Sequence, residues 1–393
     1  MESVSHLAAP ADASSQPQSP IFRLIAIGGS AGSFEEIQTI LAGVPSDFPG
    51  AICIVVHTSP QSQSLANNLA RSAAVPVIYA EDDMPILAGH VYVAPPDYHM
   101  LVNETRFSVV RGPRENHCRP AIDPLFRSVA LSFGNRARAV VLSGYLDDGA
   151  SGAIAVSRCG GRVAVQSPAS ASASDMPNNT LAAVDVDFVG NPVQLTRWLV
   201  GTFEDAAREA ERYESQLDES QQNGDADNRT GDPDDASQPN SKEDNRDQNI
   251  INDHIQREVH ISQSIESNIP LEESIGELVP MTCPECNGPL WEVHIDRVRR
   301  YRCHTGHAYT AKALVAHQDE AIESALWAAM RLMQERANSL SQLSRDGTVG
   351  GSVFERRAEE SRNNANILRQ LLVGSCKASD MGERSSQLKQ EHA

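Results

Sequence analysis

A serine flanked by glycines follows the first apolar run of the chain. The run RLIAIG leads directly into GGSAGS, residues 28–33, and FEEIQTIL then continues with helical spacing. A glycine-rich turn between a strand and a helix either binds a phosphate or exposes a nucleophilic hydroxyl. The spacing matches neither G-x-G-x-x-G nor a P-loop, because no Gly-Lys-Ser/Thr follows. We therefore predict that Ser30 is a nucleophile and look for its base.

Two further apolar runs end in residues that complete such a site. His57 follows AICIVV, and the adjacent acids Asp147 and Asp148 follow ARAVVLSG. A serine hydroxyl becomes a good nucleophile when an imidazole takes its proton and a carboxylate orients that imidazole. The chain order Ser, His, Asp disfavours an ordinary α/β-hydrolase, which runs Ser, Asp, His. Either acid is a candidate for the third position.

The elements that must bring these groups together alternate along residues 21–200. Short apolar runs are separated by segments with apolar residues three or four apart, which predicts a doubly wound, mostly parallel α/β sheet with helices on both faces. The carboxyl ends of parallel strands meet at one edge of such a sheet, where ligands and catalytic groups gather. RFSVV is expected to form an antiparallel hairpin with HMLV.

The charge distribution separates this domain from the rest of the chain. The net charge is −19, and residues 204–280 hold 21 Asp and Glu but six Lys and Arg, which accounts for −15 of it. We predict an acidic, largely disordered linker over residues 201–280, partly helical after residue 250, and a disordered tail over residues 1–20. No basic patch favours nucleic acid, and no apolar run would insert into a membrane. Without a signal peptide, a cytoplasmic location is expected.

A cysteine and histidine cluster follows the linker. CPEC begins at Cys283 and CHTGH at Cys303, with hairpin-like runs PLWEVHI and RVRRYRC between them. Cys283, Cys286, Cys303 and His307 would supply four ligands to a tetrahedral structural zinc in a zinc-ribbon-like module at residues 281–309, with His304 as the alternative fourth ligand. Full protein coordination leaves no open position, so no cofactor is expected for catalysis. The arginines at 297, 299, 300 and 302 suit nucleic-acid contact or, as we favour, a solvated strand face.

The last part of the chain has the pattern of two amphipathic helices. We predict a helical hairpin at residues 310–375 and a disordered tail at residues 376–393. Several other side chains near the predicted sheet edge have competing interpretations. His90 is expected to be structural, His99 and His117 could line a cleft, Arg119 suits an ion pair or an acidic substrate, and Cys118 is expected to be an ordinary thiol.

Several sequence blocks, in order, carry a resemblance to a known family. IAIGGSAGS, VVHTSP, AEDDMPILAGHVYVAPPDYHM, RPAIDPLF, VLSGYLDDGASG and the MPN of SDMPNN resemble the catalytic domain of the CheB-type chemotaxis methylesterases. Those enzymes hydrolyse glutamate methyl esters on chemoreceptors and often deamidate receptor glutamines. The resemblance assigns the nucleophile to Ser30, the base to His57 and the orienting acid to Asp148. It also implies oxyanion-binding amides at Ala31 and Tyr145.

The chain departs from the family pattern at three places near these residues. The elbow reads Ser30-Ala31-Gly32-Ser33 where S-T-G-G is common, His57 is followed by Thr58 where Met is typical, and Leu146 replaces a glycine in the usual G-M-G-x-D. About 20 residues precede the first strand, too few for the family's receiver domain, so we expect a switch other than phosphorylation within this chain.

The resemblance implies a serine esterase acting on a methylated receptor-like protein, with a methyltransferase or other signalling protein as a further partner. The alternative is a catalytically weakened CheB-like adaptor that uses the fold for docking.

Overall fold

The computed structural model describes residues 23–59, 64–201, 253–263, 276–295, 298–345 and 351–390, with side chains as far as residue 373 in the last range. The predicted tail at 1–20 and most of the predicted linker lie outside these residues. Two compact units divide the chain, residues 1–313 and residues 314–393. No helix among the described residues combines the length and apolar character needed to cross a membrane.

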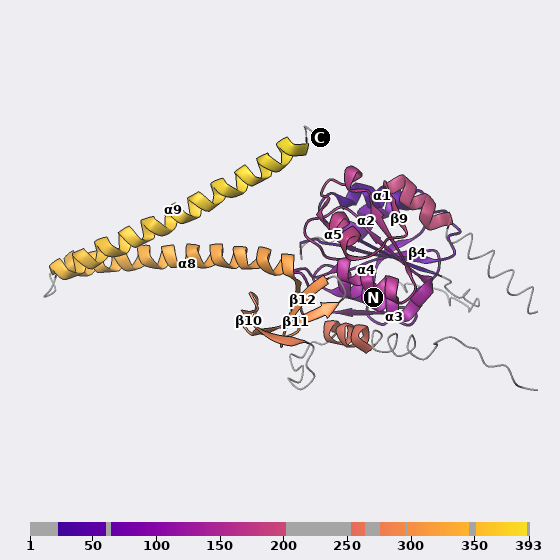
Figure 1. Ribbon diagram of the computed structural model, residues 1–393, viewed down its shortest axis with the longest axis horizontal. Helices are drawn as coiled ribbons and strands as arrows, with labels where there is room; N and C mark the ends of the chain where they lie inside the picture. Colours follow the sequence, from indigo (N-terminus) through magenta and orange to yellow (C-terminus); the bar gives the residue numbers. More distant parts are fainter. Residues whose placement is uncertain are drawn as a thin grey trace, which may run out of the picture. The chain divides into compact units, whose positions relative to one another are not determined.

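The first unit is built on a seven-stranded sheet in which every neighbouring pair is parallel (Figure 1). Its spatial order is β3-β4-β2-β1-β7-β8-β9. The strands are β1 (Leu24–Gly29), β2 (Ala51–Val56), β3 (Val77–Tyr79), β4 (His90–Val93), β7 (Ala137–Val141), β8 (Arg162–Gln166) and β9 (Phe188–Gly190). The predicted doubly wound sheet is confirmed.

Helices cover both faces of this sheet, as the continuous apolar runs predict. The helices are α1 (Ser33–Ala42), α2 (Leu65–Ala70), α3 (Ile122–Phe133), α4 (Ala150–Arg158) and α5 (Asp175–Ala183), with short 3-10 turns η1 (Gly134–Arg136) and η2 (Pro168–Ser170). Residues 192–201 are also helical. Helices α3, α4 and α5 pack in one apolar cluster, and α1, α2 and the 192–201 helix in the other.

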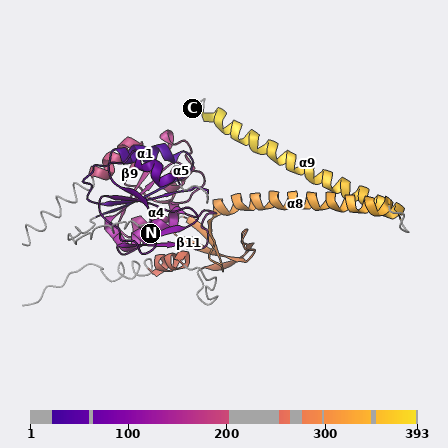
Figure 2. The ribbon, with the colours of Figure 1, turned by 180° about the vertical axis from the view of Figure 1, so that it is seen from behind.

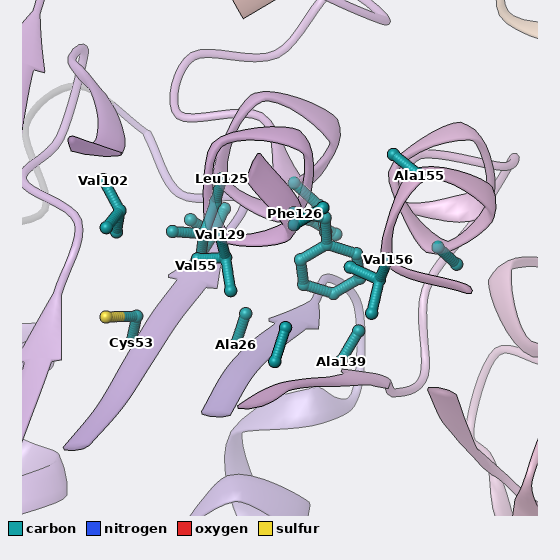
Figure 3. Close-up of a cluster of buried hydrophobic side chains, with 14 of the residues drawn as sticks. Ala26, Cys53, Val55, Val102, Leu125, Phe126, Val129, Ala139, Ala155 and Val156 are labelled. Atoms are coloured by element: carbon teal, nitrogen blue, oxygen red, sulfur yellow. The ribbon is translucent and has the colours of Figure 1, made fainter. Parts of the chain in front are cut away.

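The two faces carry side chains of different size. Alternate residues of β1 point to opposite faces, so Ile25 and Ile27 meet α1 while Leu24 and Ala26 lie in the cluster with α3. Figure 3 shows Phe126 of α3 lying above the small side chains of Ala26 and Ala139. Small residues on this face leave space for the aromatic ring between sheet and helix, and all three are buried. This packing fixes the strand ends that carry the site.

The predicted antiparallel hairpin is confirmed, and it lies on the α3 side of the domain. Strand β5 (His99–Asn103) pairs with β6 (Arg106–Val110), and Leu101 is opposite Ser108. Met100, Leu101, Val102 and Phe107 are buried in the same cluster as α3. The chain returns from β6 to α3 through residues 111–121.

Two elements of the first unit lie wholly or partly within the predicted linker. Residues 253–263 are helical, and Ile255 and Val259 are buried in the α3 cluster, so this part of the predicted linker packs on the core. Strand β10 (Glu277–Thr282) begins a four-stranded sheet of order β10-β11-β12-β13, completed by β11 (Pro289–Ile295), β12 (Val298–Cys303) and β13 (Ala308–Thr310). We call residues 276–310 the Cys/His module; its β11–β12 hairpin is as predicted.

The second unit is the predicted helical hairpin. Helix α8 (Ala311–Arg345) and helix α9 (Gly351–Gln390) are drawn in orange and yellow in Figures 1 and 2. Met330 packs with Ala365 and Leu372, and the Ser361 hydroxyl donates to the Met333 carbonyl at 2.9 Å. Helix α9 continues to Gln390, so most of the tail predicted at 376–393 is helical rather than disordered.

Candidate active site

Ser30 lies in a sharp turn between β1 and α1. Gly32 has φ 76°, a left-handed conformation that favours glycine, and a Cβ there would lie 2.4 Å from the Ser172 Cβ. The Ser30 amide donates to the Ser143 carbonyl at 2.8 Å, and the Ser33 hydroxyl donates to the Ser30 carbonyl at 2.8 Å. The serine that replaces a family glycine at position 33 therefore closes this turn with its side chain.

The structure brings the serine, histidine and aspartate together from three strand ends. His57 Nδ1 lies 3.2 Å from Ser30 Oγ, and His57 Nε2 lies 2.7 Å from Asp148 Oδ2. The imidazole is 16 % exposed and the carboxylate 3 % exposed. With the proton on Nε2 donated to Asp148, Nδ1 presents its lone pair to the serine hydroxyl, the arrangement that general-base activation needs.

Asp148 is the most extensively hydrogen-bonded carboxylate of the site. Besides His57, it accepts from the backbone amides of Ile122 at 2.7 Å and Gly149 at 3.0 Å and from Asn116 Nδ2 at 3.1 Å. Burial raises the pKa of Asp148, but His57 and these donors outweigh burial and leave the pKa below its ordinary value. Asp148 is therefore held in its ionised form against the imidazole.

Asp147, the competing acid, points elsewhere. Its Oδ1 accepts a hydrogen bond of 2.6 Å from the Thr310 hydroxyl of the Cys/His module, and the residue is buried. Burial raises the pKa of Asp147, and Thr310 partly offsets that rise. Asp147 thus does not take the third position of the triad, because its carboxylate contacts Thr310 rather than His57.

His57 is a stronger base in this site than a free imidazole. Burial lowers its pKa, but the neighbouring Cys118 and the contact with Asp148 raise it by more, and the net pKa lies well above the ordinary value. Cys118 is close enough to influence the imidazole, and the residue is half-buried.

The resemblance implied that the backbone amides of Ala31 and Tyr145 bind an oxyanion. Gly144 is so close to the nucleophile that a Cβ on it would lie 2.8 Å from Ser30 Cβ, which places the following amide, that of Tyr145, beside the serine. Among the described residues, neither the Ala31 nor the Tyr145 amide donates a hydrogen bond. Both are suited to receive a negatively charged oxygen.

The loop before the acid contains a left-handed leucine. Leu146 has φ 62° at the position where the family has glycine, and its carbonyl accepts a hydrogen bond of 2.6 Å from Asn179 Nδ2. A side chain in this conformation is strained. The hydrogen bond from α5 helps hold the loop despite that strain.

The remaining histidines and the arginine of this region have structural contacts. His90 Nδ1 donates to the Ala88 carbonyl at 2.9 Å, which confirms its structural role. His99 is fully buried between the Pro113 carbonyl and the Ala121 amide, so it does not line a cleft. His117 Nδ1 lies 3.4 Å from a Glu285 oxygen. Arg119 forms an ion pair with Asp97 at 2.8 Å, the first of the two roles considered for it.

The four predicted ligands of the Cys/His module converge on one point. The Cys286 and Cys303 sulfurs are 3.6 Å apart, and His307 Nδ1 lies 3.7 Å from the Cys283 sulfur and 3.5 Å from that of Cys303. Tetrahedral zinc with Zn–S bonds of about 2.3 Å and Zn–N bonds of about 2.0 Å requires S–S and S–N separations of about 3.8 and 3.6 Å. The exposed His304, weighed as an alternative ligand, is not among the four clustered residues.

A glutamate within CPEC orients the histidine of this cluster. His307 Nε2 lies 3.2 Å from Glu285 Oε2, which leaves Nδ1 facing the three sulfurs. A carboxylate on the outer nitrogen is the usual way in which a metal-binding histidine is held in the correct tautomer. Glu285 was not singled out from the sequence, because a glutamate between two cysteines has no distinctive spacing.

A buried ion cluster joins the module to the catalytic domain. Glu115 accepts from Arg127 of α3 at 2.7 Å and from Arg300 of β12 at 2.8 Å, and Glu258 accepts from Arg300 and Arg302 at 2.6 Å. All five side chains are at most 2 % exposed. We call these five residues the ion cluster.

The ion cluster corrects the sequence-based view of the arginines in β12. Arg300 and Arg302 lie on the same face of the strand, and that face is buried rather than solvated. Arg299 on the opposite face is 59 % exposed and pairs with Glu292 at 3.0 Å. Residue 297 lies outside the described residues. The expected solvated face therefore holds for Arg299 but is wrong for Arg300 and Arg302, because the sequence held no signal for the acids that cover them.

Known proteins are similar to this chain over the catalytic domain. A sequence model described as CheB methylesterase matches residues 25–199. A protein-glutamate methylesterase/protein-glutamine glutaminase 1 of Rhodospirillum rubrum is 39% identical over 165 residues, 40% of this chain and 42% of that protein. A putative protein-glutamate methylesterase/protein-glutamine glutaminase of Leptospira interrogans serovar copenhageni is 35% identical over 170 residues, 43% of this chain and 88% of that protein.

A solved structure also aligns with the domain. The crystal structure of the Thermotoga maritima CheB methylesterase catalytic domain has 28% sequence identity and a TM-score of 0.45, and the alignment covers 46% of this chain and 98% of that chain. The chain thus spans less than half of the R. rubrum relative but most of the L. interrogans protein. On the family match and the L. interrogans relative, this chain belongs to the CheB methylesterase family.

Proposed function

We propose that residues 21–200 hydrolyse methyl esters of glutamate side chains on a receptor-like protein and release methanol. The observation that carries the proposal is the continuous contact Ser30–His57–Asp148, at 3.2 and 2.7 Å. Relatives bear the names methylesterase and glutaminase, which supports a carbonyl of a glutamyl side chain as the reacting group.

The geometry suits acyl transfer through a serine ester. His57 Nδ1 takes the Ser30 proton while Oγ attacks the ester carbonyl carbon, and the Ala31 and Tyr145 amides stabilise the resulting oxyanion. The imidazolium returns the proton to the departing methoxide, so methanol leaves and an acyl-serine remains. Water, deprotonated by His57, then attacks that ester and releases a free glutamate and Ser30.

The same steps would deamidate a glutamine, with ammonia in place of methanol as the leaving group. We infer that a methyltransferase supplies the ester, because the substrate must first be esterified. We infer a cytoplasmic location, where thiols remain reduced and the sulfurs of Cys283, Cys286 and Cys303 would be able to bind a metal.

Methanol release from a methylated receptor fragment tests the activity. Ser30→Ala is expected to abolish turnover and labelling by a fluorophosphonate, and His57→Ala to reduce both by orders of magnitude. Ser167→Ala is the matched control, because Ser167 directly follows β8 as Ser30 follows β1. Turnover and labelling that are equal in wild type and Ser30→Ala would contradict the proposal and favour the adaptor alternative.

We also propose that Cys283, Cys286, Cys303 and His307 bind one structural zinc ion. The separations of the ligand atoms and the carboxylate behind His307 support this site. A metal content of one zinc per chain is expected for wild type and close to none for Cys283→Ser. Cys159→Ser, which alters a thiol distant from the cluster in sequence, should retain the metal; wild type without zinc would refute the site.

A further inference from the structure

The turn between β6 and α3 lies between the triad and the Cys/His module. It is closed by hydrogen bonds between Glu115 and Cys118, of 2.9 and 3.3 Å, and its two central residues are left-handed, Asn116 at φ 50° and His117 at φ 64°. Asparagine adopts this conformation more readily than most residues. The turn therefore directs the Asn116 side chain inward, where it is 3 % exposed.

The Asn116 amide group contacts the acid of the triad. Its Nδ2 donates to Asp148 Oδ1 at 3.1 Å and to Asp123 Oδ2 at 3.2 Å. The other Asp148 oxygen accepts from His57. Asn116 thus holds the carboxylate from the side opposite to the imidazole and stabilises its negative charge.

The Cys/His module in turn holds Asn116. The backbone amide of Thr310 donates to the side-chain oxygen Oδ1 of Asn116 at 3.0 Å. The backbone amide of Asn116 in turn donates to the Ala308 carbonyl at 2.8 Å. Both partners belong to β13, which starts at the residue after His307. The Thr310 hydroxyl also donates to Asp147, so β13 contacts the loop of the acid on two sides.

The ion cluster fixes this contact. Glu115, next to Asn116, forms an ion pair with Arg300 of β12. In the same segment, Gly112 packs against the 253–263 helix so closely that a Cβ on it would lie 2.0 Å from the Ser262 carbonyl oxygen. Buried charges tolerate separation from their partners poorly. The module is therefore held in one position on the catalytic domain.

We propose that the Cys/His module positions the triad through Asn116, so that esterase activity depends on an intact four-ligand cluster. Asn116 is a positioning residue, which acts on Ser30 through Asp148 and His57. The inference rests on the proposed esterase function. It implies that the availability of the metal controls esterase activity. Loss of the metal from the ligand cluster would loosen β13, and the contact between β13 and Asn116 would loosen with it.

The direct test replaces Asn116 in the full-length chain with glycine, which tolerates the left-handed conformation while removing the amide. We expect kcat for methanol release, and the rate of fluorophosphonate labelling of Ser30, to fall roughly 10- to 100-fold, with KM little changed, because a hydrogen bond to a charged group is lost. The acid limb of kcat/KM should move to higher pH, since a less stabilised carboxylate attracts the imidazolium proton more strongly. A merely structural residue would not move that limb.

Glu104→Gly is the matched control, because it changes an exposed left-handed residue, at φ 53°, in the turn between β5 and β6. It should retain wild-type kcat and pH profile. Equal kinetics for Asn116→Gly and wild type would overturn the positioning role. If wild type itself neither turns over nor labels, the proposed function and this inference both fail; if wild type is active and only the Asn116 effect is absent, the inference alone fails.

The metal dependence is tested on the wild-type protein. Removal of zinc with a chelator should lower kcat at least as far as Asn116→Gly does, and addition of zinc sulfate should restore it. Asn116→Gly should respond less than wild type to the same treatment, because its contact with β13 is already missing. Unchanged kcat in demonstrably zinc-free protein would overturn the coupling.

Discussion

The catalytic domain is held together by apolar packing across its sheet, whereas the Cys/His module is held against it by buried ions. In the domain, Phe126 lies over Ala26 and Ala139 without any directional bond (Figure 3). At the module, Arg300 contacts both Glu115 and Glu258. Apolar packing tolerates related side chains, while a buried ion needs its own partner. The difference indicates that the module is specific to this surface.

The largest effect is expected inside the domain, at the acid of the triad. Asp148→Asn keeps the shape of the side chain but removes the charge that stabilises the imidazolium, and the equivalent change in the serine-protease triad lowers kcat about 10⁴-fold. Asp147→Asn is the control, because its carboxylate bonds Thr310 instead of His57. Methanol release measures both, and an equal loss in the two variants would mean that the acid was assigned wrongly.

The next largest effect is expected at the ion cluster. Arg300→Met leaves Glu115 and Glu258 buried with fewer donors and should lower the free energy of unfolding of the first unit by about 3–5 kcal/mol. Arg299→Met, on the exposed face of the same strand, should change it by about 0–1 kcal/mol. Urea unfolding followed by circular dichroism provides the measurement, and similar values for the two variants would contradict the contrast between buried and exposed ions.

The two regions should also respond to acid at different pH. The pKa of His57 is raised above the ordinary histidine value of about 6.5. Below that raised pKa the imidazole is protonated and cannot act as a base, so kcat/KM should fall about tenfold for each unit by which the pH is lowered. Burial raises the pKa of Glu115, but Arg127, Arg302 and Arg300 lower it by more. The ionised Glu115 carboxylate therefore stabilises the folded state fully above about pH 4.3, the ordinary glutamate pKa. This stabilisation is lost as the pH falls through the lowered pKa of Glu115 in the folded protein.

A pH–rate profile and hydrogen exchange of the β12 and β13 amides separate these two events. Activity should be lost while the amides remain protected, and protection should fail only in stronger acid. Simultaneous loss of both would mean that the interface, rather than His57, sets the acid limit of activity.

The smallest effect is expected at the strained loop beside the acid. Leu146→Gly removes the steric penalty at φ 62° and should raise the free energy of unfolding by about 1 kcal/mol. Tyr145→Gly, one residue earlier and without a positive φ, should give no gain. Thermal unfolding measures both, and destabilisation by Leu146→Gly would show that the leucine side chain contributes more than its conformation costs.

Three features could be predicted because their signals are local. The doubly wound sheet follows from strand and helix periodicity, and the turn around Ser30 follows from its glycines. The spacing of Cys283, Cys286, Cys303 and His307 indicated a ligand cluster before any contact was known. In each case the physical requirement falls within a few residues of the chain, where sequence patterns are informative.

The sequence by itself determined which strand ends carry Ser30, His57 and Asp148 and which faces of the strands are buried. Only the tertiary structure decided that Asn116 contacts Asp148, and that Arg300 meets a glutamate 185 positions away along the chain. Alternation along a strand specifies that one side differs from the other, but it does not specify what covers that side. A buried ion pair is formed by two distant segments, and neither one carries a pattern that identifies its partner.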